Sequence, residues 1–384
     1  PVTPTNLTAE AGSSHVALSW PKDQFATSYN VYRSTAPGME TLYVSGLKAP
    51  FFADTNVVRG TTYYYQVAAV NSAGASDNSA EISAMLPALS LYSARVLADL
   101  PVAFYPLDET SGSIAYDLSG HHYDGTYTNA PSLGIAGPSG FLSGGASFNE
   151  ASQWVSQWSH YQWVDLGNPA ALNFSGAITL EAWVKPVYAG TPNYFENVLC
   201  RGYNTGNGIE TALRLNGMDS FQIGVYSYSL GGGSIAKGSP AASAGQWVYL
   251  AGTFDGTYWN LYTNGVLAGR SPSTVGALTS TDHWAIGNGT GGGDGRFYLG
   301  PISHAAIYNY ALSASQIQAH YLAGIAGTLS VEMELSGTNA VLTWPGGTLQ
   351  QAGVITGPFS DVANAVSPLT LPLTATNKFF RVKF

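Results

Sequence analysis

The chain has 384 residues, a formal net charge of −9 and only 14 Lys and Arg residues, so it offers no basic patch for nucleic acid and is too long for one ordinary domain. Abundant Gly and Tyr, with only 10% charged residues, are typical of an all-β protein with Gly-rich turns. No apolar run approaches the roughly 20 residues that a membrane span needs. Cys200 is the single cysteine, which forbids an internal disulfide, and the chain opens without a signal peptide. We therefore expect a mature or excised piece of a longer secreted bacterial protein.

Residues 1–87 are predicted to form a β-sandwich. Strand-like segments such as HVALSW and TTYYYQVAAV are separated by Gly, Pro, Asn and Asp clusters at sandwich spacing. Trp20, Tyr29, Val31 and the run from Gly60 to Asn71 make this segment resemble a fibronectin type III domain, which has an immunoglobulin-like fold. The resemblance implies that Tyr63 forms the tyrosine corner and that Trp20 lies in the core. We assign this domain a spacer or scaffold role.

A helix is predicted at the start of a second domain. In the segment LSLYSARVLADL, Leu89, Tyr92 and Val96 are spaced for one face of a helix, and Pro101 ends the pattern. Strand signals such as ITLEAWVKP follow, and Asn264-Gly265 predicts a tight hairpin. From about residue 89 to 324 these segments resemble the laminin-G-like, concanavalin-type jelly roll of secreted bacterial proteins. The resemblance implies two antiparallel sheets packed face to face, a ligand on the concave sheet or its rim loops, and a closing helix in ALSASQIQAHY.

The predicted domains are thus a fibronectin type III-like sandwich over residues 1–87, a jelly roll over 88–325 and a small all-β unit over 326–384. The last unit has short strand signals that include TLSVEMEL and KFFRVKF. At Leu342-Thr343-Trp344-Pro345 and Phe379-Phe380-Arg381 it resembles a β domain found at the ends of exported proteins from environmental bacteria. That resemblance suggests a cap, a spacer or a surface-retention role.

The residues of the jelly roll do not predict catalysis. Retaining glycosidases need two carboxylates about 5 Å apart, but Glu181 stands alone in its strand, and there is no Gly-x-Ser-x-Gly motif. Cys200 has no surrounding motif that would activate its thiol and is expected to be a small buried hydrophobe. We therefore expect no enzyme activity in this chain, although a catalytic domain could precede it in a longer precursor.

A structural calcium ion is the one cofactor that the sequence suggests. Asp117 and Asp124 offer hard oxygen ligands on Gly-rich turns, the chemistry that calcium prefers. Similar jelly rolls often hold one calcium, with an acidic residue before the last strand, where this chain has Ile302-Ser303-His304. The alternative is that both Asp residues only form turns.

An aromatic stretch suggests where a ligand binds. Residues 149–167 contain Trp154, Trp158, Tyr161 and Trp163. Trp163 is expected on a strand, whereas the other three are spaced for one face if the segment before the strand is helical. Such a face either covers one end of the sandwich or meets a ligand. Loops that combine aromatic, amide and guanidinium groups could frame the same rim, and sugars require that mixture of stacking faces and planar polar groups. The ligand contacts that we expect are Trp154, Trp158, Tyr161, Tyr194, Arg201, Tyr203, Tyr226 and Asn288.

These observations predict non-catalytic binding of a polysaccharide or another glycan by the jelly roll, as an accessory part of a secreted or surface protein. The alternative is a structural or adhesive extracellular protein that contacts other proteins or copies of itself, because both domain types serve both uses. A groove with open indole rings would favour a glycan, whereas a flat apolar patch or a pairing edge strand would favour adhesion.

Overall fold

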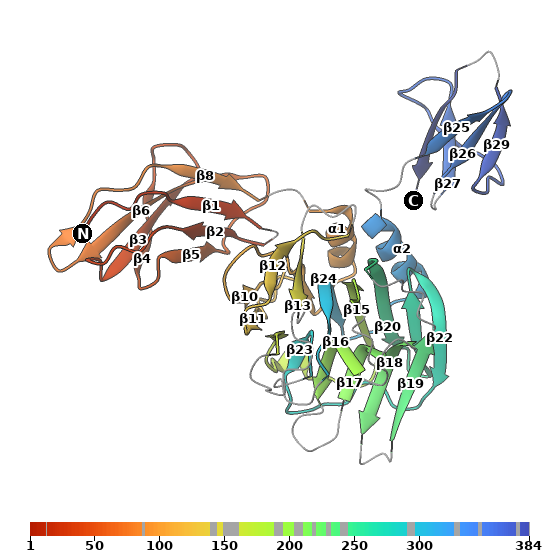
Figure 1. Ribbon diagram of the computed structural model, residues 1–384, viewed down its shortest axis with the longest axis horizontal. Coiled ribbons are helices and arrows are strands. Elements are labelled where there is room, and N and C mark those ends of the chain that lie inside the picture. The colour runs from red at the N-terminus through yellow and green to blue at the C-terminus, as the bar shows by residue number, and fades with distance from the viewer. Residues whose placement is uncertain are drawn as a thin grey trace. The chain divides into compact units, whose positions relative to one another are not determined.

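The computed structural model describes two compact units of the chain, Pro1–Leu89 with Tyr116–His122, and Ser90–Ala115 with Tyr123–Phe384 (Figure 1). The fold is built mainly of antiparallel strands, as the composition predicts. The residues described are 1–12, 14–86, 89–138, 144–148, 161–187, 195–202, 210–216, 220–227, 232–238, 245–289, 296–325, 331–344, 348–373 and 377–383. No helix in these ranges is both long and apolar enough to cross a membrane.

The N-terminal unit is the predicted sandwich of two sheets. Trp20 and Tyr29 meet edge to face in its core, with ring centroids 5.3 Å apart. The phenol oxygen of Tyr63 accepts the N–H of Val58 at 3.1 Å, which is the backbone contact expected of a tyrosine corner. One sheet has the order β1 (Thr8–Ala11), β2 (Val16–Ser19), β5 (Phe51–Asp54); the other has β4 (Thr41–Leu47), β3 (Ser28–Ser34), β6 (Thr62–Asn71), β7 (Gly74–Ala75), with β8 (Ile82–Met85) also paired to β6.

The predicted helix before the jelly roll is α1, Leu91–Ala98. It begins where Ser90 provides an N-cap, since the Ser90 hydroxyl accepts the N–H of Ser93 at 3.0 Å. The buried residues Tyr92 and Val96 lie on one face of the helix, as the spacing predicts. A second helix, α2 (Ala314–Ile325), lies beside α1 and confirms the predicted closing helix.

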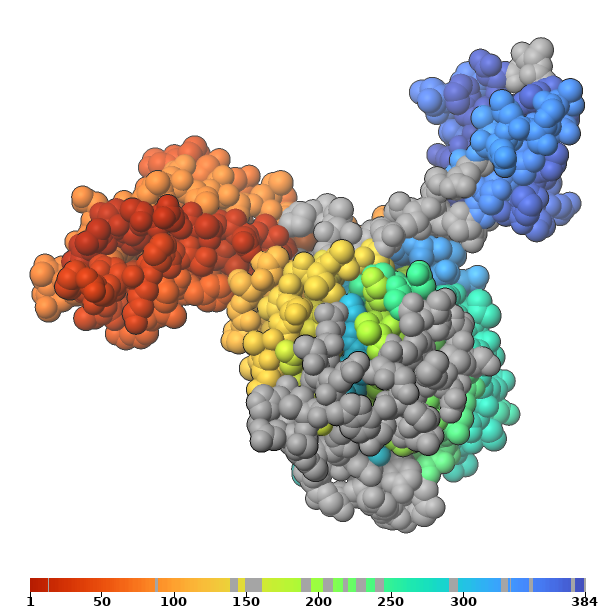
Figure 2. All heavy atoms as spheres, in the orientation of Figure 1, coloured from red at the N-terminus to blue at the C-terminus, as the bar shows by residue number. Residues whose placement is uncertain are grey.

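The jelly roll consists of two eight-stranded sheets, which we call the back sheet and the front sheet. The back sheet has the order β12 (Ser132–Ile135), β13 (Gly145–Phe148), β24 (Gly300–Tyr308), β15 (Ile178–Val184), β20 (Val248–Phe254), β21 (Tyr258–Thr263), β22 (Val266–Pro272), with β9 (Ala103–Tyr105) paired to β24. Asn264 and Gly265 have φ values of 49° and 78°, as the predicted tight turn between β21 and β22 requires. Strand β22, turquoise in Figure 2, forms surface at one edge of the jelly roll.

The front sheet has the order β10 (Ile114–Ala115), β11 (Gly125–Thr128), β14 (Trp163–Asp165), β23 (Trp284–Ile286), β16 (Phe195–Gly202), β17 (Glu210–Asn216), β18 (Ser220–Ser227), β19 (Gly232–Gly238). Alternate residues of both sheets fill one apolar core. Leu213, Ile223 and Trp284 enter this core from the front sheet, and Leu180 and Leu250 enter it from the back sheet. The other residues of each strand point to the outer faces, and these faces carry the polar groups described below.

The C-terminal strands form two small sheets, blue in Figure 2. Leu342, Trp344 and Leu349 are buried together between them, so this segment has an apolar core of its own. Their orders are β25 (Glu332–Ser336), β26 (Asn339–Thr343), β29 (Leu369–Pro372), and β28 (Ser360–Asp361), β27 (Thr348–Ala352), β30 (Phe379–Lys383). The division of the chain into three domains stays a prediction.

Candidate functional site

A row of small side chains crosses the outer face of the front sheet. Cys200 on β16 is paired with Ala285 on β23 and with Ala212 on β17, and Ala212 is paired with Gly224 on β18. Residues directly opposite each other on neighbouring strands point to the same face of a sheet. The middle of this outer face is therefore a floor without bulky side chains, across four adjacent strands.

The indole of Trp163 packs against this floor. Trp163 lies in β14, as predicted, and contacts the buried cluster of Cys200, Ala212 and Ala285. It is only partly buried, unlike Trp284 of β23, whose ring fills the core on the other side of the sheet. Trp163 is thus an aromatic ring on the outer face whose surroundings leave part of its surface uncovered.

A buried charged cluster lies on the same face. The Arg214 Nη1 atom lies 2.8 Å from Glu210 Oε2, and the Arg296 Nη1 atom lies 2.6 Å from both carboxylate oxygens. Glu210 and Arg214 are four residues apart on one strand, and they reach each other above Ala212 because the alanine side chain is short. Both guanidinium groups also lie over the ring of Phe195, at 3.9 and 5.0 Å from its centroid. Opposite charges and ring contacts thus hold this cluster in place.

Burial shifts the ionisation of groups in and next to the cluster. Burial lowers the pKa of Arg214 below its ordinary value, although the carboxylate of Glu210 opposes the shift. Glu196, on β16, is buried enough to raise its pKa to about 7, while the N–H of Leu299 partly stabilises the charged form. Near neutral pH, Glu196 therefore carries only part of a negative charge, whereas Arg214 remains a cation.

Two buried amides complete the site. The Asn197 Nδ2 atom lies 3.3 Å from Glu210 Oε1, and the Cys200 thiol donates to the carbonyl of Asn288 at 3.1 Å. Both asparagines have no exposed surface. Among the described residues, however, Asn197 Oδ1 and Asn288 Nδ2 have no hydrogen-bond partner. Other buried atoms of the described residues, such as Thr211 Oγ1 and Thr263 Oγ1, share this property, so it does not by itself identify a ligand site.

The ligand contacts expected from the sequence fall in different places. Tyr161 is nearly buried and stacks on Phe297 with ring centroids 4.4 Å apart. Asn288 lies in the site just described, and Tyr226 lies on β18 opposite Glu210. Trp154, Trp158, Tyr194 and Tyr203 lie outside the described residues.

The side chain of Arg201 is enclosed by the protein and does not face solvent. Its guanidinium is buried and donates to the carbonyls of Leu172 and Phe174 and to the side chain of Asn173. Its Nη2 atom also donates to the carbonyl of Leu278. Burial lowers the pKa of Arg201 to about 10. In this arrangement its donors are occupied by the protein and are not available to a ligand.

The structure describes the local contacts of Asp117, one of the two aspartates expected to bind calcium. Asp117 accepts the N–H and the hydroxyl of Ser119 at 2.9 and 2.7 Å, the bonding of an ordinary Asx turn. It belongs to the N-terminal unit, whereas Asp124 belongs to the second unit. Within the described ranges, no group of three or more His, Cys, Asp and Glu residues could hold a metal ion. Calcium binding stays a prediction.

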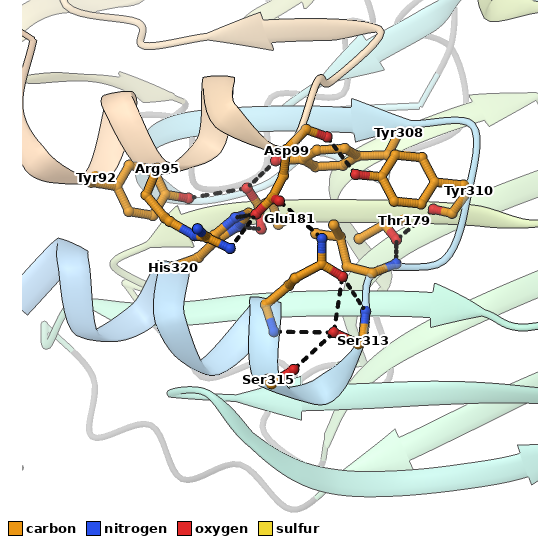
Figure 3. A network of polar contacts seen from close by, with 12 residues as sticks. Tyr92, Arg95, Asp99, Thr179, Glu181, Tyr308, Tyr310, Ser313, Ser315 and His320 are labelled. Atoms are coloured by element: carbon orange, nitrogen blue, oxygen red, sulfur yellow. Dashed lines mark hydrogen bonds and ion pairs between the residues drawn. The ribbon is translucent and has the colours of Figure 1, made fainter. Parts of the chain in front are cut away.

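Glu181 lies on the opposite side of the jelly roll, between the back sheet and the two helices (Figure 3). The carboxylate is fully buried. It accepts hydrogen bonds from the phenols of Tyr92 at 3.4 Å and Tyr308 at 3.1 Å, and from that of Tyr249. The imidazole Nδ1 atom of His320 lies 2.9 Å from the same group. A carboxylate with four partners and no exposed surface joins α1 and α2 to the sheet and cannot meet a substrate in a cleft.

His320 links Glu181 to a second carboxylate. Its Nε2 atom lies 2.9 Å from Asp99 Oδ2, which also pairs with Arg95 at 2.9 Å (Figure 3). Burial disfavours the charged ring, but the two carboxylates outweigh burial and raise the pKa of His320 above its ordinary value. A protonated imidazole can donate to Glu181 and Asp99 at once, which explains why its two nitrogens face two acids.

Sequence reasoning missed the charged cluster, although a signal for it was present. In the segment ETALRLN, the alternation of a strand places Glu210, Ala212 and Arg214 on one face and the leucines on the other. A carboxylate and a guanidinium on the polar face of a strand, separated by a small residue, indicate such a pair. Nothing local to Arg296 could have shown that it joins them, because it comes from a segment 82 residues further along the chain than Arg214.

Comparisons with known proteins agree with this architecture. Residues 158–318 match the family model described as the concanavalin A-like lectin/glucanases superfamily. A fibronectin type III-like protein from Clostridium thermocellum is 37% identical and aligns over 23% of this chain and 96% of its own, with a TM-score of 0.22. Domain 4 of an extracellular arabinanase from Geobacillus stearothermophilus, solved with arabinotriose, is 21% identical over 58% of this chain and 98% of its own, with a TM-score of 0.43.

Two amylopullulanases match short stretches. The one from Thermoanaerobacterium saccharolyticum is 38% identical over 84 residues, and the one from Thermoanaerobacterium thermosulfurigenes is 35% identical over 75 residues. These stretches are 22% and 19% of this chain, which spans only 6% and 4% of the two enzymes. The chain is a multidomain protein in which a fibronectin type III-like domain precedes a jelly roll, and residues 158–318 of this jelly roll match the model of the concanavalin A-like lectin/glucanases superfamily.

Proposed function

We propose that the jelly roll binds polysaccharide without cleaving it, through the outer face of the front sheet, as an accessory part of a secreted or surface protein. The observation that carries this proposal is the partly open indole of Trp163, which lies against a floor of small side chains beside a charged cluster. A CH face of a sugar ring can stack on Trp163, while its hydroxyls meet polar groups that border the floor.

The charges of the site support binding over catalysis. Glu210 is the carboxylate of the described cluster, and both of its oxygens are engaged by two guanidinium groups. Glycoside cleavage needs a second carboxyl group as its acid or nucleophile. Glu181 does not supply one, because it lies beneath the helices on the other side of the core. Glu196 is paired with the core residue Leu215 and therefore points away from the outer face. The amylopullulanase relatives support an accessory role beside a catalytic domain elsewhere in a longer protein.

Binding at a single site is expected to be weak. Stacking on one indole contributes about 1 kcal/mol beyond the area that it buries, so micromolar to millimolar dissociation constants are expected. Repetition of the ligand along a polymer raises the effective affinity, provided that several copies of the protein or several sites engage one chain. This range suits a domain that keeps an enzyme close to an insoluble substrate without fixing it in place.

Replacing Trp163 with Ala is expected to reduce retention in polysaccharide gels by about five- to tenfold, because the stacking surface is removed. Trp163→Phe keeps an aromatic face and should retain part of the binding. Tyr258→Ala is a matched control, since it deletes a ring on β21 of the back sheet. Affinity electrophoresis of the full chain against a panel of neutral and acidic polysaccharides measures all three. Equal retention of wild type and Trp163→Ala would show that this indole is not part of the binding site.

The aromatic stretch before β14 is tested in the same gels. The double variant Trp154→Ala/Trp158→Ala is expected to lower retention further if these rings share the ligand with Trp163. Wild type is also run with and without a chelator, and a loss of retention in chelator would support the calcium ion expected from Asp117 and Asp124. If wild type binds no polysaccharide, the adhesive alternative replaces the proposal, and self-association is then measured by sedimentation.

A further inference from the structure

The described part of the charged cluster on the front sheet contains two cations and one anion. The whole chain carries a net charge of −9 and has only 14 Lys and Arg residues. Nevertheless, two guanidinium groups, Arg214 and Arg296, share the carboxylate of Glu210. The three side chains retain only 7%, 12% and 2% of their exposed surface, respectively. Burying two cations beside one carboxylate costs desolvation free energy. A bound anion would offset part of this cost.

A third cation lies on the same face. Arg214 on β17 is paired with Gln222 on β18, and Gln222 is paired with Lys237 on β19. Because paired residues share a face, the three side chains form one row across the sheet. The Gln222 Oε1 atom accepts from Arg214 Nε at 3.2 Å, which orients the guanidinium along the row. Lys237 is exposed, so it adds a solvent-accessible charge at the end of the row.

A hollow lies beside this row. It is small, no larger than a water molecule needs, and is lined by Glu210, Ala212, Arg214, Gly224, Val225 and Ile235. Gly224 allows β19 to approach closely, since a Cβ atom at this position would lie 2.2 Å from the carbonyl oxygen of Ser234. No other residue fits there without moving the neighbouring strand. The hollow therefore combines a floor of small residues with a guanidinium in its wall.

We propose that the front face selects acidic polysaccharides, whose carboxylate or sulfate groups bind Arg214 and Lys237 beside the hollow. This inference rests on the proposed function and names the class of its ligand. Planar guanidinium groups suit both kinds of anion, because their N–H groups bind two oxygens in parallel. A neutral hydroxyl makes weaker contacts to a cation than an anion does, so the site distinguishes a charged sugar from a neutral one mainly through the cations.

Matched pairs of polymers test the inference directly. Polygalacturonate is compared with its methyl ester, and a sulfated galactan is compared with its desulfated form, so that backbone and stacking surface stay the same while the charge is removed. We expect the full chain to be retained at least tenfold more strongly by the charged member of one pair. The pair that responds identifies the anion as carboxylate or sulfate. Raising NaCl from 50 to 500 mM should weaken binding of the charged polymer and leave the neutral one nearly unchanged.

Variants of the row separate this inference from the proposed function. Arg214→Gln and Lys237→Gln are each expected to reduce retention by the charged polymer several-fold, and Lys237 is exposed, so its replacement should not disturb folding. Lys22→Gln removes the same charge from an exposed site on the N-terminal unit and should change nothing. If neutral and charged polymers are retained equally and Trp163→Ala still weakens both, the acidic selectivity is wrong and glycan binding stands. If no polymer is retained, both fail.

Discussion

Glu181→Gln is expected to lower the free energy of unfolding of the jelly roll by about 3 kcal/mol or more, because it removes one charge from a buried pair. The wild-type carboxylate accepts from three phenols and from His320, whereas the amide of Gln brings two donors into a site that already holds only donors. His320 would also lose one of the two acids that favour its charged form. The variant should therefore loosen both helices from the back sheet.

Urea unfolding of the full chain, followed by near-ultraviolet circular dichroism, measures this loss. Tyr249→Phe removes a single donor and is expected to cost about 1 kcal/mol. Glu334→Gln makes the same chemical change at an exposed position on β25 and should stay within about 0.5 kcal/mol of wild type. Wild-type stability in Glu181→Gln would mean that the network contributes little to folding. Polysaccharide retention by the folded variant should be unchanged, because Glu181 lies on the other side of the core from the front face.

The sequence predicted the elements of the fold because their signals are local. The spacing of Tyr92 and Val96 indicates α1, and Asn264-Gly265 indicates the hairpin of β21 and β22. Trp163 was expected on a strand, and it lies on β14. Periodicity, caps and turn residues need only neighbours a few positions away, and they determine element type before any tertiary contact forms.

The candidate site was only partly predictable, because its contacts join distant segments. Arg201 illustrates the difficulty, since a guanidinium in a loop-like sequence suggests a ligand, yet the fold surrounds it with the carbonyls of residues 172 and 174. Glu181 stands alone in its strand, and no local pattern shows that helices about 90 residues before and 140 residues after it close over its carboxylate. Because the side chains of Arg201 and Glu181 are both buried, their charged groups contact other parts of the fold.

The two outer faces of the jelly roll therefore use buried charge differently. Beneath the helices, Glu181 and His320 are fully buried, and Asp99 and Arg95 extend their ion pairs toward the surface. On the front face, Glu210 pairs with two guanidinium groups next to a partly open indole and an exposed lysine. The first network joins helices to a sheet, whereas the second borders groups that a ligand can reach.

Two buried histidines of the jelly roll are expected to change its stability with pH in opposite directions on either side of about pH 6.5. The raised pKa of Glu196, about 7, adds a loss of stability as the pH rises from about 4.5 to 7, so each histidine is read from the difference between its variant and wild type. Burial lowers the pKa of His304 to about 3, so between about pH 6.5 and 3 the unfolded chain binds a proton that the folded protein excludes. Stability from this group falls as the pH falls, by at most about 1.4 kcal/mol per pH unit. The folded-state pKa of His320 is raised, so its contribution is complete below the unfolded value of about 6.5 and is lost as the pH rises through the folded-state pKa.

In a plot of unfolding free energy against pH, we call the part below about pH 6.5 the acid limb and the part above it the alkaline limb. Measurements on the full chain from pH 4.5 to 9, with one variant for each limb, test the assignment. His304→Asn should flatten the acid limb, and Asn suits the position because His304 has a φ of 53°, which asparagine tolerates. His320→Gln should flatten the alkaline limb while lowering stability at every pH at which the wild-type imidazole is charged. His15 in the N-terminal unit also has a pKa lowered to about 4 by burial, so the acid limb must be read from the jelly-roll transition. An alkaline limb that persists in His320→Gln would show that another group, and not the imidazole between Glu181 and Asp99, carries the pH dependence.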